Sequence, residues 1–168
     1  MVTAAISTAG DYLWANVLPH GRPVYWFAHA IVLFSTVGAC LGAPAGKPLS
    51  GMIGAVAIGC AATLGFYLLQ PLIGYSALFV LFFGLWLALG ALTVRVLHRR
   101  RGVRDILIRS SIAAFGSGLG FYAISGIWRP FDPHGWDYAI HFVSWIVAYL
   151  PAYVALLMSA SNERARRR

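Results

Sequence analysis

The fold is decided by stretches such as residues 50–69, which read SGMIGAVAIGCAATLGFYLL and contain no charged residue. The hydrocarbon core of a bilayer is about 30 Å thick, and an α-helix needs about 20 apolar residues to cross it. Unpaired backbone groups are costly in lipid, and these residues do not alternate as those of a barrel strand do. The stretch therefore predicts a membrane-spanning helix.

Four further stretches have the same character, so the sequence predicts an all-α, polytopic transmembrane helical bundle with five long helices. Residues 3–18 form a shorter apolar stretch that includes Asp11 and Asn16. This segment fits a short crossing helix, a re-entrant piece or an interfacial helix, and the sequence leaves open whether it crosses. The five long stretches are residues 24–43, 50–69, 72–94, 106–127 and 138–158.

The composition of the whole chain supports this fold class. Of the 168 residues, 60% are hydrophobic and 11% are charged, whereas an average soluble domain has about 45–50% apolar and about 25% charged residues. So few charged groups cannot cover the surface of a soluble domain of this size. We expect one integral-membrane domain over residues 1–168. Its parts are an N-terminal segment (1–23), a five-helix bundle (24–158) and a basic tail (159–168).

The positive charges predict the orientation of the chain. If residue 21 lies outside, Arg22 and Arg129 are the only two of the 13 Lys and Arg residues on the outer side. Basic residues favour the cytoplasmic side, so we expect a multi-pass protein of a bacterial-type cytoplasmic membrane with a cytoplasmic C-terminus. The basic clusters flank apolar stretches and no nucleic-acid motif occurs. The net charge of +8 therefore indicates contact with the lipid bilayer rather than with nucleic acid.

Two sequence patterns concern the packing of the helices. The tetrapeptide LGFY occurs at residues 64–67 and again at residues 119–122, near the ends of two outward-going helices. It predicts a bundle built from parallel two-helix hairpin repeats. Small residues four apart, as at Gly38 and Gly42, let helix backbones approach closely. Such contacts form within one chain, in a homo-oligomer or in a larger membrane complex.

The segment before the last helix holds the densest group of polar and aromatic residues, at the expected outer boundary. Asp137 and His141 are four residues apart at the start of a helix, so they share one face. Aromatic faces with a few polar groups are typical of small-molecule pockets. The candidate ligand-binding residues are Trp128, Arg129, Asp132, His134, Trp136, Asp137 and His141.

Three interpretations of this segment are open. In the first, Asp137 caps the last helix, and the Trp and Tyr residues form an interfacial belt. In the second, an outward-facing pocket binds or transports a small, largely neutral solute as its ligand. In the third, histidines bind a transition metal or haem b, as in a membrane redox protein. The candidate metal ligands are His29, His134, Asp137 and His141.

None of the five long helices has an acidic or basic residue in its middle third, where proton and ion pathways usually need one. We therefore expect handling of a neutral solute rather than ion pumping. A non-catalytic subunit of a larger complex is the remaining alternative. The sequence identifies no catalytic residue, so enzymatic activity is left open.

Overall fold

The computed structural model describes residues 1–17, 23–74, 76–96, 103–127 and 133–157. Over these ranges the chain forms α-helices and one short 3-10 helix but no strand, which confirms the all-α prediction. Each helix begins and ends within a few residues of an apolar stretch that the sequence predicts to be helical. The helices are α1 (Val2–Asn16), α2 (Pro23–Gly42), α3 (Pro48–Ile73), α4 (Ser76–Val96), α5 (Val103–Ile127) and α6 (Asp137–Leu157), and the 3-10 helix η1 (Ala43–Ala45) follows α2.

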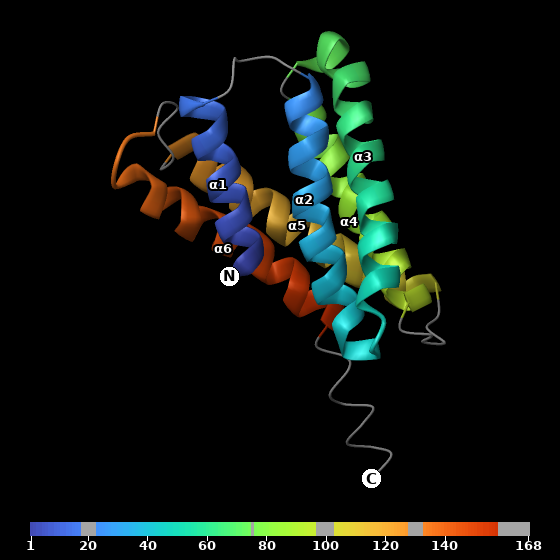
Figure 1. The fold of residues 1–168 in the computed structure, drawn as a ribbon. Coiled ribbons are helices and arrows are strands. Elements are labelled where there is room, and N and C mark those ends of the chain that lie inside the picture. Colours follow the sequence, from blue (N-terminus) through green and yellow to red (C-terminus); the bar gives the residue numbers. More distant parts are fainter. Residues whose placement is uncertain (18–22, 75, 97–102, 128–132, 158–168) are drawn as a thin grey trace.

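The helices form a ring in chain order, and α1 closes it. From α2 to α6, each helix packs on the next. α1 packs mainly on α6 and also on α2, so it lies between them (Figure 1). The helices from α2 to α6 run alternately up and down, whereas α1 begins about halfway along the bundle and covers one half of it. The first and last helices therefore share an interface.

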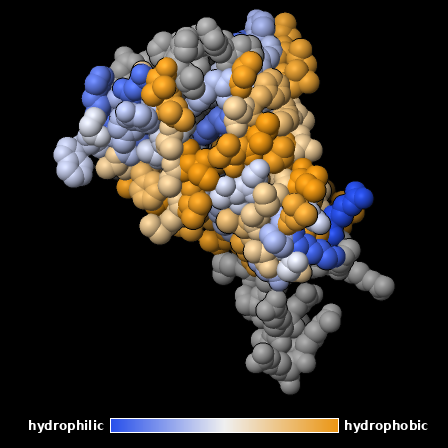
Figure 2. Space-filling view, in the orientation of Figure 1, coloured by the Kyte–Doolittle hydropathy of each residue, from blue (hydrophilic) through white to orange (hydrophobic). Residues whose placement is uncertain are grey.

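Three helical segments are long and apolar enough to span a membrane: Val24–Ala45, Pro48–Ile73 and Asp137–Leu157. α4 is apolar along most of its 21 residues and carries Arg95 in its last turn, whereas the first turn of α5 carries Asp105. On the face shown in Figure 2, hydrophobic residues fill the middle, and hydrophilic residues gather towards the upper left and the lower right. These features indicate a membrane protein. They do not confirm five spans or hairpin repeats.

The small residues are used for packing inside the chain. A Cβ atom added to Gly38 of α2 would lie 2.2 Å from the carbonyl oxygen of Gly51 in α3, and one added to Gly51 would lie 2.1 Å from the carbonyl oxygen of Gly38. The two backbones are therefore in direct contact. At Gly116 of α5, an added Cβ atom would lie 2.9 Å from the Cβ atom of Pro151 in α6, so a proline side chain occupies the space there. In lipid, such contacts provide dispersion attraction where water exclusion cannot.

The centre of the ring is apolar and reaches the interface between α1 and α6. Leu41 of α2 and both Trp86 and Leu89 of α4 are almost completely buried there. Tyr149 of α6 belongs to the same cluster. Its ring stands edge-on to Trp86, with 6.5 Å between the ring centroids. Tyr149 therefore connects the core to α1, where its hydroxyl has a polar partner.

Candidate functional site

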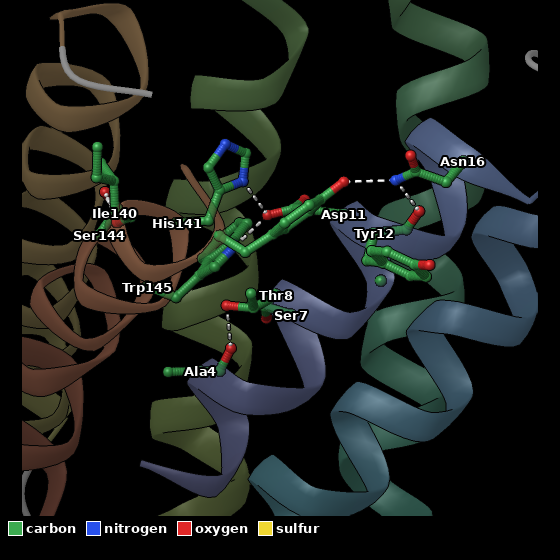
Figure 3. A network of polar contacts seen from close by, with 12 residues as sticks. Ala4, Ser7, Thr8, Asp11, Tyr12, Asn16, Ile140, His141, Ser144 and Trp145 are labelled. Carbon is green, nitrogen blue, oxygen red and sulfur yellow. Dashed lines mark hydrogen bonds and ion pairs between the residues drawn. The ribbon is translucent and has the colours of Figure 1, made fainter. Parts of the chain in front are cut away.

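The main polar site of the described chain is centred on Asp11, which α1 directs towards α6 (Figure 3). Its Oδ2 lies 2.8 Å from Nδ1 of His141 and 2.7 Å from Nε1 of Trp145. The Asp11 side chain is 22% exposed, and that of His141 is 4% exposed. A carboxylate and an imidazole thus meet inside the helical bundle. Ionisable side chains within a membrane domain commonly mark functional sites.

Helical periodicity explains why these side chains meet. His141, Trp145 and Tyr149 are four residues apart along α6, so they form one stripe on its surface. Ser7 and Asp11 form a matching pair on α1, also four residues apart. The two stripes face each other, because α1 packs along α6. The antiparallel directions of the helices set Asp11 beside His141 and Ser7 beside Tyr149.

Two further polar contacts join the same helices. One turn deeper than Asp11, the Ser7 and Tyr149 hydroxyls lie 3.0 Å apart and are buried. Nearer the end of α1, the amide of Asn16 donates to the hydroxyl of Tyr138. The Tyr149 ring also stacks on Trp145, with 5.6 Å between centroids and 20° between planes. We call this row of contacts between α1 and α6 the polar seam.

One nitrogen of His141 has no partner within the described residues. The hydrogen-bond network assigns a proton to Nδ1, because an ionised Asp11 carboxylate can only accept. Nε2 is buried and makes no hydrogen bond to any described group. It is an acceptor in a neutral imidazole and a donor in an imidazolium. An unsatisfied buried polar atom costs about 1–3 kcal/mol, so Nε2 is a favourable place for an additional hydrogen-bonding group.

His29 lies on the other side of α1. Its ring stacks on Tyr25, with 5.9 Å between centroids, and a Cβ atom added to Gly10 would lie 2.1 Å from the ring. The Tyr25 hydroxyl donates to the Gly10 carbonyl oxygen. Gly10 thus packs against α2, while its neighbour Asp11 binds α6. The close approach of α1 to α2 depends on the missing side chain at Gly10.

The turn before α6 uses two of the predicted ligand-binding residues for capping. A carboxylate oxygen of Asp137 accepts the backbone N–H of His134 at 3.0 Å, as the side chain of a capping box does. Asp137 therefore serves the helix start, and Asp11 is the carboxylate that contacts His141. Trp136 is 90% exposed, and His134 is exposed as well. Trp128, Arg129 and Asp132 lie outside the described residues.

The predicted metal ligands are distributed over three places. His29 packs on Gly10, His134 and Asp137 belong to the turn, and His141 contacts Asp11. In the part of the chain that the structure describes, no group of three His, Cys, Asp or Glu side chains could hold a metal ion. The arrangement that is present is a carboxylate bound to one ring nitrogen of an imidazole, while the other ring nitrogen has no hydrogen bond to a described group.

Asp11 is the residue that sequence reasoning missed. The charge of Asp11 leaves open whether the N-terminal segment crosses the membrane. The expectation that ionisable groups are absent from the middle of the membrane applies to the five long helices, which do not include Asp11. The sequence does show that Ser7 and Asp11 share one face of a helix, which indicates a polar stripe on that helix. No local pattern, however, links that face to His141, which is 130 residues away.

No family model, curated protein or solved structure matches this chain. The function must therefore be inferred from the site itself.

Proposed function

We propose that this chain is a multi-pass membrane protein that binds or transports a small, largely neutral solute through His141. In this proposal α4 and α5 cross the bilayer together with the three apolar helices, and the solute enters from the outer side. Arg95 and Arg104 lie towards the ends of α4 and α5 that the positive-inside rule assigns to the cytoplasm. The proposed location is a bacterial-type cytoplasmic membrane, with the C-terminus inside.

The observation that carries the proposal is Nε2 of His141, which is buried and has no hydrogen-bond partner among the described residues. Asp11 holds the ring through Nδ1, so Nε2 has a fixed direction and does not need to reorganise when a solute binds. A hydroxyl or amide group can both donate and accept, so it suits either protonation state of the imidazole. Such a group on a neutral molecule avoids burying a second charge beside the Asp11 carboxylate.

Aromatic side chains around His141 support an apolar component in the same solute. The Tyr138 ring lies 5.9 Å from the imidazole, between centroids, and Trp145 flanks the carboxylate. Binding sites for small molecules typically combine aromatic walls with a few fixed polar groups. Small alcohols, amides and phenols have this combination of properties, and charged solutes do not.

The experiment that tests the proposal compares His141→Asn with His134→Asn. The amide introduced by His141→Asn can still donate to Asp11 but offers nothing at the Nε2 position. The same substitution at the exposed His134 is the matched control. Full-length protein in nanodiscs would be titrated with glycerol, acetamide, urea and phenol, with thermal stability as the measured quantity. We expect at least one of these to bind, and its affinity to fall about tenfold in His141→Asn, as for one lost hydrogen bond.

The control variant shows whether a molecule binds at the buried His141 or at the turn before α6. We expect His134→Asn to bind the same molecule as tightly as the wild type does. If no molecule of the panel stabilises the wild type, or if His141→Asn binds equally well, the proposed solute site is wrong. If only His134→Asn loses binding, the site lies at the turn before α6.

A further inference from the structure

The exposed face of α5 carries a shallow apolar groove that the solute site does not involve. Its volume is about 600 Å³. The residues lining it lie three or four positions apart, so they form one continuous face of the helix. Ser111 is small and the neighbouring side chains are large, which produces the depression. Gly116 also lines it, with its Cβ position directed at Pro151 of α6. The lining residues are Leu107, Ile108, Ser111, Ile112, Phe115 and Gly116.

A positive charge lies at one end of this groove. Arg104 precedes Leu107 and Ile108 by three and four residues, so it lies on the same face, and it is exposed. The neighbouring arginine is already used: Nε of Arg109 lies 2.9 Å from Asp105, and its Nη1 donates to the carbonyl oxygen of Ala155. Among the described residues Arg104 makes no ion pair, which leaves its guanidinium available to an external anion.

The length of the groove corresponds to one leaflet of a bilayer. From Leu107 to Gly116 the helix rises about 14 Å, at about 1.5 Å per residue. Half of a hydrocarbon core is about 15 Å. Arg104 lies about one helical turn beyond the apolar lining, which in an inserted chain corresponds to the level of the lipid phosphates. The groove therefore has an apolar part about as long as the acyl region of one leaflet, and a cation at the end where the lipid headgroup would lie.

We propose that the α5 groove binds one anionic phospholipid, with its phosphate on Arg104 and an acyl chain along the lining residues. Among the described residues, the charge of Arg104 lies at one end of a one-leaflet groove, which matches a phospholipid because a phospholipid carries its charge at one end. A guanidinium binds phosphate oxygens through a planar pair of N–H donors. The inference rests on insertion of the chain into a membrane and does not depend on the solute site at His141.

Native mass spectrometry of the full-length protein, released from detergent, would test this proposal. The protein would be incubated with phosphatidylglycerol or phosphatidylcholine of the same acyl chains. We expect one phosphatidylglycerol molecule to remain bound in preference to phosphatidylcholine. Arg104→Gln should reduce its retention about fivefold, the factor expected for one basic residue at an anionic lipid surface. Lys47→Gln removes a positive charge from the same end of the bundle, and we expect it to retain the lipid.

A second variant tests the apolar part of the site. Ser111→Phe fills the groove and keeps Arg104, so retention of the long-chain lipid should fall although the charge is unchanged. Equal retention of both lipids by the wild type would overturn the proposal. So would equal behaviour of Arg104→Gln and Lys47→Gln, competition by glycerol 3-phosphate alone, or a protein dimer that Ser111→Phe dissociates. His141→Asn should leave lipid retention unchanged, which separates this test from that of the solute site.

Discussion

Two interfaces of the ring hold their helices together in opposite ways. Between α2 and α3, Gly38 and Gly51 bring the backbones into direct contact. Between α1 and α6, the polar seam joins side chains, and its central group is a carboxylate that receives both an imidazole and an indole N–H. The first interface has no space for a further molecule. The second contains a buried nitrogen, Nε2 of His141, without a described partner.

The difference separates an interface held by backbone contact from an interface held by polar side chains. Close contact of small residues stabilises a membrane protein through dispersion alone. In a buried polar seam, each polar atom needs a hydrogen-bond partner. Each buried atom without a partner lowers the stability of the fold by about 1–3 kcal/mol. His141 Nε2 is one of several such atoms in the described chain, and it differs from the others in belonging to a ring that a carboxylate holds in place. The comparison can be tested by substitutions on each side.

The largest effect is expected at the glycine contact. In Gly38→Ala the new Cβ atom would lie 2.2 Å from the carbonyl oxygen of Gly51 and 2.7 Å from Cβ of Ala55. The obstructing oxygen belongs to the backbone, so α2 and α3 must separate. We expect the free energy of unfolding in mixed micelles, followed by circular dichroism, to fall by about 3 kcal/mol.

Gly84→Ala in α4 is the matched control, because a Cβ atom there meets nothing within 4 Å. Alanine has the higher helix propensity, so stability should stay constant or rise by up to about 1 kcal/mol. Equal losses at Gly38 and Gly84 would contradict the close backbone contact.

An intermediate effect is expected at Asp11. In Asp11→Leu, both Nδ1 of His141 and Nε1 of Trp145 lose the acceptor that they share. We expect the free energy of unfolding to fall by about 2 kcal/mol, measured in the same way. Asp11→Asn keeps an acceptor oxygen for the indole and should lose about half as much. If Asp11→Leu is as stable as the wild type, the seam does not stabilise the fold.

The smallest effect is expected at the deepest contact of the seam. The Ser7 and Tyr149 hydroxyls exchange one neutral hydrogen bond. A double-mutant cycle with Ser7→Ala and Tyr149→Phe should give a coupling energy of about 0.6 kcal/mol, the usual value between membrane helices. A coupling energy of zero would show that the two hydroxyls act independently.

The sequence predicts the helices well and the site only in part. Lipid requires long apolar helices, so hydropathy alone locates α2 and α3 within a few residues. Asp137 at the start of α6 is likewise readable as a cap, one of the interpretations that the sequence leaves open, and it accepts the His134 N–H. The partner of His141 is not readable, because the pairing with Asp11 depends on how the ring closes. Hydropathy describes each helix separately and contains no information about which helices become neighbours.

The closing of the ring by α1 sets the order of events during synthesis. Asp11 leaves the ribosome 130 residues before its partner His141. At the usual speed of translation this delay is about 10 s. A carboxylate is costly in the bilayer core while it lacks a partner. Docking of α1 therefore waits until α6 has been synthesised, because the donors that pair with the Asp11 carboxylate lie on α6.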